Sequence, residues 1–227
     1  MKKNIIRLSA VAFIAAAAIF TGCNKEDTTA PVVTLTGDAS KTISLNSTYT
    51  EEGATATDDE DGAITPTVSG TVNEDLAGTY TITYTATDAA GNSSSATRTV
   101  IVRNDAYALE GTYSGNETDI NGPYTYVQNN VVTASATVNN RVELTRLGDF
   151  ANNTVYLNIT GTTITIPSQT VSNVGTGSNQ CDVHNRQTDG VGTITTTPVG
   201  FTLTYNDSKV APCSGTRTGV QAVFVKQ

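Results

Sequence analysis

The strongest constraint on the fold is a strict two-residue alternation between threonine and apolar side chains. Within residues 79–87, each of the apolar positions lies between two threonines: Tyr80, Ile82, Tyr84 and Ala86. Successive side chains of a strand point to opposite faces, so this segment predicts a β-strand with one buried and one solvated face. Period-two alternation returns in residues 154–159, where Val155, Leu157 and Ile159 alternate with other residue types, and in residues 201–205, where the intervening residues are again threonine. The chain is therefore expected to contain half-buried antiparallel strands.

The composition favours strands and turns over helices. Hydrophobic residues make up 37% of the 227 residues and charged residues 15%, and there are 19 glycines. Threonine and valine are favoured in strands, whereas glycine, asparagine and aspartate are favoured in turns. An all-β protein is predicted, and its length suits two small domains.

A polar hinge at Asn104 divides the chain. Between Asn24 and Arg103 there are 12 acidic and 4 basic residues, and from Asn104 onward there are 9 and 6. We therefore predict one domain over residues 31–103 and another over residues 104–227. Strand patterns in the first domain occupy residues 32–35, 42–45, 64–68, 79–86 and 97–102.

Several motifs of the first domain resemble the immunoglobulin-like repeat of bacterial surface proteins. They are Gly53–Asp58, Asp61-Gly62, Gly78-Thr79-Tyr80, Tyr84–Asp88, Gly91-Asn92 and Arg98-Thr99-Val100. The resemblance implies an N-terminal immunoglobulin-like β-sandwich that acts as a spacer or an interaction module.

The second domain contains eight or nine short strand patterns, and residues 159–164 read as a hairpin. This pattern predicts an antiparallel β-barrel or a second sandwich. The segments Leu109–Tyr113, Leu157–Gln169, Gly192–Ile194 and Leu203–Tyr205 resemble the lipocalin-like or barrel-like C-terminal domains of Bacteroidetes lipoproteins.

Residues 1–22 predict a secretory signal peptide. A positive n-region precedes an apolar run that is too short to span a bilayer: Lys2, Lys3 and Arg7, then Leu8 to Phe20. The junction before Cys23 resembles a lipoprotein signal, which implies acylation of Cys23 and attachment to the lipid bilayer. The acidic tether at residues 23–30 resembles the export tag of Bacteroidetes surface lipoproteins. It implies an outer-membrane anchor that faces the cell exterior, and a plain solvated tether is the alternative.

The charge of the mature chain disfavours polyanionic partners. Removal of three basic residues with the signal peptide leaves 10 basic against 21 acidic residues, a net charge of −11. Such a surface repels phosphate backbones, so no nucleic-acid partner is predicted.

Two cysteines remain after Cys23, and an exported protein encounters an oxidising environment. A disulfide between Cys181 and Cys213 is therefore predicted. His184 is the single histidine, and the chain contains no nucleophile elbow and no phosphate-binding loop. Carboxylate pairs for glycoside hydrolysis could come from Glu110, Glu117, Asp119 or Glu143, but loop carboxylates are usually solubilising. We predict no enzyme.

Two acidic turns of the first domain could supply oxygen ligands to a calcium ion. The candidate residues are Asp58, Asp59, Asp61, Asp88 and Asn92. Calcium takes six to eight oxygen ligands, but the EF-hand spacing is absent, and solvated turns are the alternative.

The predicted function is a surface binding module for glycan, accessory to nutrient capture. The aromatic candidates for stacking on sugar rings are Tyr113, Tyr124, Tyr126 and Tyr156. One alternative is a structural protein whose immunoglobulin-like domain spaces the C-terminal domain for an outer-membrane protein partner. Another is a barrel that holds a small apolar ligand.

Overall fold

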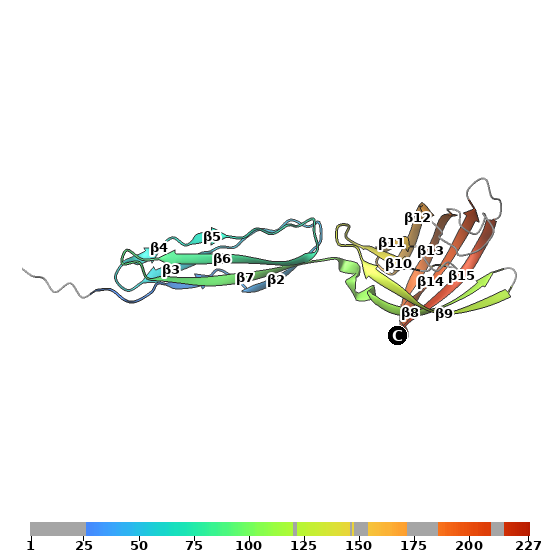
Figure 1. Cartoon of the computed structure of the whole chain (residues 1–227), viewed down its shortest axis with the longest axis horizontal. Coiled ribbons are helices and arrows are strands. Elements are labelled where there is room, and N and C mark those ends of the chain that lie inside the picture. Colours follow the sequence, from blue (N-terminus) through green and yellow to red (C-terminus); the bar gives the residue numbers. More distant parts are fainter. Residues whose placement is uncertain (1–25, 120–121, 146, 148–153, 172–185, 210–215) are drawn as a thin grey trace, which may run out of the picture.

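The computed structural model describes residues 26–119, 122–145, 147, 154–171, 186–209 and 216–227. It confirms an all-β chain with a sandwich-like part followed by a barrel. Figure 1 shows the two domains end to end, with the N-terminal segment leaving the sandwich at the end opposite the barrel.

The N-terminal domain contains two sheets. The three-stranded sheet has the order β1 (Val32–Leu35), β3 (Ala54–Asp58) and β4 (Gly62–Ile64). The four-stranded sheet has the order β2 (Ser40–Ser44), β7 (Ser93–Arg103), β6 (Gly78–Thr87) and β5 (Thr67–Ser69). All pairs are antiparallel except β2 with β7, which are parallel.

Two details of this domain differ from the predicted strands. Residues 64–68 form the end of β4 and the start of β5, which belong to different sheets. Pro66 lies between them, and because it has no N–H group it is poorly suited to the interior of one continuous strand. The strand pattern of residues 54–58 was missed, although its Ala/Thr alternation was present.

The core of the sandwich follows the alternation in β6. Ile82, Tyr84 and Ala86 are buried, and Val100 of β7 packs in the same cluster as Ile82 and Tyr84. Tyr80 is partly buried against this cluster. The period-two prediction for this strand is confirmed.

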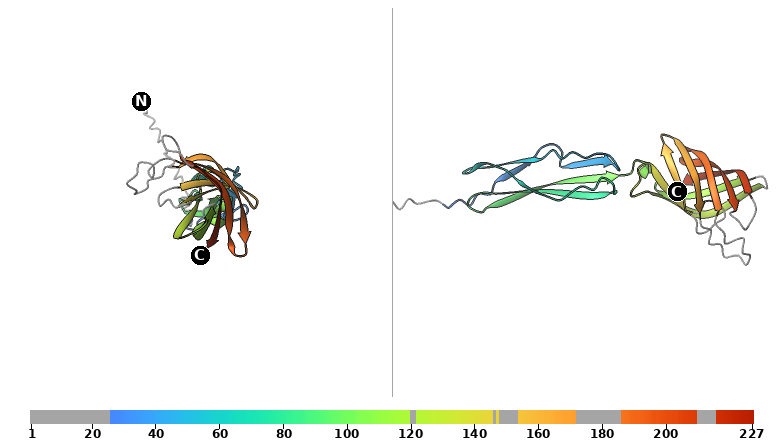
Figure 2. Two further views of the ribbon diagram at one scale, coloured as in Figure 1. Left: turned by 90° about the vertical axis from the view of Figure 1, so that its right-hand side faces the viewer. Right: turned by 90° about the horizontal axis from the view of Figure 1, so that it is seen from above.

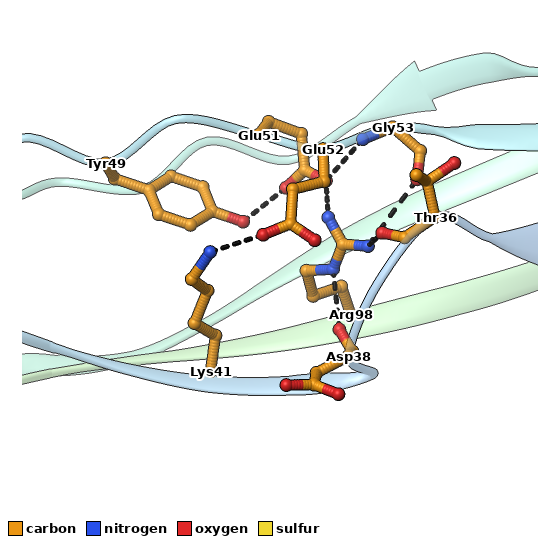
Figure 3. A network of polar contacts seen from close by, with 8 residues as sticks. All are labelled: Thr36, Asp38, Lys41, Tyr49, Glu51, Glu52, Gly53 and Arg98. Carbon is orange, nitrogen blue, oxygen red and sulfur yellow. Dashed lines mark hydrogen bonds and ion pairs between the residues drawn. The ribbon is translucent and has the colours of Figure 1, made fainter.

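A buried arginine of β7 binds the segments that precede and follow β2 (Figure 3). Arg98 of β7 is 1% exposed and forms an ion pair with Glu51. Its Nε donates to the carbonyl of Asp38 at 2.9 Å, and Nη2 donates to the carbonyl of Thr36. Tyr49 donates its hydroxyl to the same Glu51 carboxylate. The guanidinium thus joins β7 to the chain on either side of β2.

Asn104 organises the joint between the domains. This residue is 2% exposed and precedes the short 3-10 helix η1 (Asp105–Leu109). Its Nδ2 donates to the carbonyls of Ser135, Val138 and Arg141 at 2.9, 3.0 and 2.9 Å. Its Oδ1 accepts from the N–H groups of Ala106 and Asn140, each at 3.0 Å. One side chain thereby fixes the linker to the hairpin formed by residues 135–140.

The same hairpin also contacts the sandwich directly. The N–H of Ala77 donates to the carbonyl of Ala136 at 2.7 Å. The N–H of Asn139 donates to Oδ1 of Asn46 at 2.9 Å. The domains are therefore joined by hydrogen bonds from two separate segments of the sandwich as well as by the linker.

The C-terminal domain is a closed eight-stranded antiparallel barrel (Figure 2). Its strands are β8 (Gly111–Asp119), β9 (Gly122–Ala134), β10 (Arg141–Thr145), β11 (Thr154–Thr160), β12 (Thr163–Val171), β13 (Arg186–Thr196), β14 (Val199–Lys209) and β15 (Thr216–Lys226). Each strand pairs with the next along the chain, and β15 pairs with β8 to close the cylinder. The choice between barrel and sandwich is thus decided in favour of the barrel.

An aromatic stack lies in the core of the barrel. The ring of Phe201 lies 5.1 Å from that of Tyr113 and 4.7 Å from that of Phe224, measured between centroids. Aliphatic side chains from β9 to β12, β14 and β15 complete this core, as expected for a small barrel whose interior is filled by side chains.

Candidate functional site

Tyr113 lies in the barrel core and is not a surface platform. The residue is 0% exposed, and its hydroxyl donates to the carbonyl of Leu109 at 2.7 Å. Burial raises the pKa of this phenol above its ordinary value. The expectation that Tyr113 stacks on a ligand is therefore corrected, because its side chain points inward from β8 and its ring packs against Phe201 in the core.

Some predicted residues lie wholly or partly outside the described structure. The backbone of β9 places Tyr124 opposite Glu117 and Tyr126 opposite Gly115, but the side chains of the two tyrosines are outside the described part. The lipidation residue Cys23 and the two cysteines of the predicted disulfide, Cys181 and Cys213, also lie outside it.

Tyr156 is exposed on the outer wall of the barrel. The residue is 43% exposed on β11, and the guanidinium of Arg141 lies 5.5 Å from its ring centroid. Gln169 holds the backbone at this point. Its Oε1 accepts from the N–H of Tyr156 and its Nε2 donates to the carbonyl of Tyr156, both at 2.9 Å.

A groove of about 530 Å³ lies on the barrel wall over β12, β13 and β14. Its lining consists of Thr165, Ile166, Pro167, Ser168, Asp189, Gly190, Val191, Thr204 and Asn206. A register shift between Ile166 and Gln169 places one extra residue in β12 relative to β13. Pro167 lies in this bulge, where its missing N–H costs no ladder hydrogen bond.

Glycine is required beside this bulge. A Cβ atom at Gly190 would lie 2.5 Å from the carbonyl oxygen of Thr204 and 2.7 Å from Cα of Tyr205. No side chain fits at that separation, so Gly190 allows β13 and β14 to approach closely under the groove.

Three of the five polar side chains in the groove have no hydrogen-bond or ion-pair partner among the described residues. Among the described residues, the side chains of Asp189, Thr165 and Thr204 make no hydrogen bond or ion pair, and all three residues are exposed. Asn206 is held in place because its Oδ1 accepts from the N–H of Gly219 at 3.1 Å. The groove thus offers hydroxyl, amide and carboxylate groups to a ligand.

Tyr156 extends this surface onto the neighbouring strand. Asn158 of β11 is paired with Thr165 of β12, which lines the groove. Tyr156 lies two residues from Asn158 and therefore on the same face of β11. An exposed aromatic ring and a polar groove consequently share one wall of the barrel.

A second polar cluster lies inside the barrel. Tyr205 donates its hydroxyl to Oε1 of Glu117 at 2.9 Å, and Arg217 forms an ion pair with Asp207 at 3.0 Å. Burial, followed by the charge of Glu117, raises the pKa of Tyr205. Burial acts to lower the pKa of Arg217, but Tyr205, Asp207 and Glu117 together raise it above its ordinary value. An interior with buried charge is unsuited to a purely apolar ligand.

Carboxylates gather at the end of the sandwich that lies nearest the tether. One oxygen each from Asp27, Asp58 and Asp88 lie within 4.8 Å of one another. The structure therefore brings together two of the predicted calcium residues and adds Asp27, which sequence reasoning missed. Asp27 could not be assigned to this site from the sequence, because its approach to the two turns depends on the tertiary fold.

The other predicted calcium residues lie around this set. Asp61 accepts from the N–H of Ala89 at 2.6 Å, which links the two turns. Asn92 donates through Nδ2 to Asp88 at 2.9 Å and to the carbonyl of Asp27 at 3.1 Å. Asp59 is exposed and does not belong to the three-carboxylate set.

The carboxylates differ in their hydrogen bonding. Burial acts to raise the pKa of Asp88, but hydrogen bonds from the side chain and backbone of Asn92 and from nearby N–H groups bring it below its ordinary value. Oδ1 of Asp58 accepts from the N–H groups of Glu60 and Asp61 at 2.9 and 3.0 Å. Oδ2 of Asp58 is buried and has no hydrogen-bond partner among the described residues.

Comparison with known proteins identifies the N-terminal domain. Residues 33–102 match the family model described as "Bacterial surface protein, Ig-like domain". This match confirms the prediction of a bacterial immunoglobulin-like domain and fits a protein of the bacterial surface.

A solved structure covers more of the chain. The lipoprotein BT2262 from Bacteroides thetaiotaomicron aligns with 87% of this chain and 100% of its own, at 17% identity and a TM-score of 0.34. The search of curated proteins finds no match.

Within the described part of the chain, no helix is both long enough and apolar enough to cross a membrane.

Proposed function

We propose that this protein is a non-catalytic glycan-binding module of the bacterial surface and that its ligand lies in the groove on the barrel wall. The observation that supports this proposal is the groove of about 530 Å³ next to the exposed ring of Tyr156. Several polar side chains of the groove have no partner among the described residues. A volume of this size lies within the range of small-molecule sites. Sugars present hydroxyl groups and apolar ring faces, and this wall offers partners for both.

The rest of the chain serves to present this wall. Acylated Cys23 anchors the protein in the outer membrane, and the immunoglobulin-like domain spaces the barrel from the lipid. Support for the spacing role comes from the end-to-end arrangement in Figure 1, with the tether and the barrel at opposite ends of the sandwich.

Replacing Tyr156 with alanine is expected to weaken glycan binding by about 1 to 2 kcal/mol, or about 5- to 30-fold, as for loss of an aromatic anchor. Isothermal titration calorimetry of the full ectodomain with soluble polysaccharides measures this change. Tyr156→Phe keeps the ring and should bind nearly as well as the wild type.

Tyr107→Ala is the matched control, because Tyr107 is also 43% exposed but lies at the interdomain joint. Equal loss in the two alanine variants would contradict a site on the barrel wall.

A second candidate function is that of a structural protein that holds the barrel out for a protein partner. The hydrogen-bonded joint around Asn104 favours it, because a fixed joint would present one barrel face in a constant orientation. Cell-surface cross-linking that captures one defined protein, with no binding to any polysaccharide, would favour this candidate over glycan binding.

We also propose that the carboxylates of Asp27, Asp58 and Asp88 bind calcium. Three negative charges within 4.8 Å repel one another by on the order of 1 kcal/mol per pair in water and more at lower dielectric. A cation offsets this repulsion and would supply a partner for the buried Oδ2 of Asp58. Because Asp27 belongs to the tether, the ion would fasten the tether to the sandwich.

Calcium is expected to raise the melting temperature of the ectodomain, with a gain of about 2.7 kcal/mol at a concentration 100 times the dissociation constant. Differential scanning calorimetry with calcium and with a chelator tests this. In the chelator, Asp58→Asn should melt no lower than the wild type, since it removes repulsion, and it should lose the response to calcium. Glu60→Gln removes an equal charge outside the set and should respond like the wild type. An identical melting temperature with and without calcium would reject the site.

A further inference from the structure

Asp189 differs chemically from every other residue in the groove on the barrel wall. It is the one charged residue among the nine that line the groove. The other polar side chains are the hydroxyls of Thr165, Ser168 and Thr204 and the amide of Asn206. Asp189 is exposed, and its carboxylate makes no hydrogen bond or ion pair with the described residues. The groove therefore carries one available negative charge in an otherwise neutral lining.

A free carboxylate suits a ligand that donates hydrogen bonds. Its two oxygens act only as acceptors and can receive two neighbouring donors at once. Adjacent hydroxyls on a sugar ring supply such a pair. Asn206 complements this arrangement, because its Oδ1 accepts from the N–H of Gly219 and its Nδ2 donors remain available to a ligand oxygen.

The same carboxylate disfavours anionic ligands. Two like charges 4 Å apart repel by about 1 kcal/mol in water and about 4 kcal/mol at a protein surface, equivalent to between about 5-fold and several hundred-fold in affinity. Among the described residues that line the groove, none is basic and able to offset this charge. The guanidinium of Arg141 lies two strands away over Tyr156, and its Nε donates to Asn158 at 3.0 Å.

We propose that Asp189 determines the specificity of this groove by accepting hydrogen bonds from adjacent hydroxyls of a neutral sugar and by excluding uronic and sulfated sugars. This inference rests on the proposed glycan function and names the substrate class of the same site. The negative net charge of the mature chain acts in the same direction at longer range.

The test compares the binding of neutral and anionic polysaccharides to the full ectodomain. Dextran and galactomannan serve as neutral probes, and polygalacturonate and heparin serve as anionic ones. The wild type should bind at least one neutral probe at least 10-fold more tightly than either anionic probe, and added salt should narrow the difference because it screens the repulsion. Asp189→Ala should lose about 10-fold or more on the neutral probe, and Asp189→Asn should discriminate less against the anionic probes.

Glu60→Gln is the control for net charge, since it removes one exposed acid in the other domain. It should leave both affinities unchanged. Binding of an anionic probe as tight as that of the neutral probes, or a neutral affinity unaffected by Asp189→Ala, would overturn the role of Asp189 while leaving glycan binding in place. Failure of the wild type to bind any of the four would reject the glycan function itself.

Discussion

Arg98→Ala is expected to destabilise the immunoglobulin-like domain by roughly 3 to 5 kcal/mol, because it removes a buried cation and leaves the carboxylate of Glu51, which is 26% exposed, without its counter-charge. Arg98 is 1% exposed and joins Glu51 and two backbone carbonyls to β7. Loss of the guanidinium removes all of these contacts together. Calorimetry of the full ectodomain should show a lower transition for the sandwich, with the barrel transition little changed.

Lys41→Ala provides the matched control in the same network (Figure 3). The Lys41–Glu52 ion pair lies at the surface, where its two side chains are 39% and 38% exposed. Exposed pairs contribute about 0 to 1 kcal/mol, so this variant should melt close to the wild type. Comparable destabilisation by the two variants would refute a special role for the buried arginine.

Asn104→Ala is expected to cost roughly 3 kcal/mol or more and to loosen the joint between the domains. The two N–H donors of its Nδ2 lie within hydrogen-bond distance of three carbonyls, and its Oδ1 accepts from two N–H groups. A buried polar group left without a partner costs about 1 to 3 kcal/mol. Amide hydrogen exchange should become faster at residues 105–109 and 135–141, and small-angle scattering should report a wider range of interdomain angles.

One further variant separates the contacts of Asn104, and a second variant serves as a control. Asn104→Asp keeps the acceptor for Ala106 and Asn140 but loses the Nδ2 donors, so it should still weaken the hairpin of residues 135–140. Asn116→Ala removes an exposed asparagine from β8 that makes no described side-chain hydrogen bond. This variant should change neither the amide exchange rates nor the small-angle scattering. Wild-type exchange rates in Asn104→Ala would show that the joint does not depend on this amide.

Local patterns predicted the strands because a few neighbouring residues are enough to show a period-two alternation. The alternation in β6 identified its buried face, and the turn motifs around Asp58 and Asp88 identified the immunoglobulin-like domain. The same reasoning overlooked β3 and joined β4 to β5 across Pro66. A short Ala/Thr strand carries little hydrophobic contrast, so its pairing with β1 was visible only in the sheet.

The candidate sites depended more on tertiary structure. Tyr113 and Tyr156 both lie in alternating strands, yet one is fully buried and the other is 43% exposed. Tyrosine suits either face of a strand, because its ring is apolar and its hydroxyl is polar, and closure of the barrel then decides which tyrosine faces the core. The groove around Asp189 likewise includes a bulge in β12 that residue spacing alone did not reveal.

The sequence alone determined that this chain is all-β, that it contains an immunoglobulin-like domain and which face of β6 is buried, because period-two patterning is a local property. Tertiary structure alone decided that the second domain closes into a barrel, that Asp27 meets Asp58 and Asp88, and that Asn104 joins the domains. These features bring together residues that are far apart in the chain. The contacts and charge pairs that stabilise these features form only after the strands have paired.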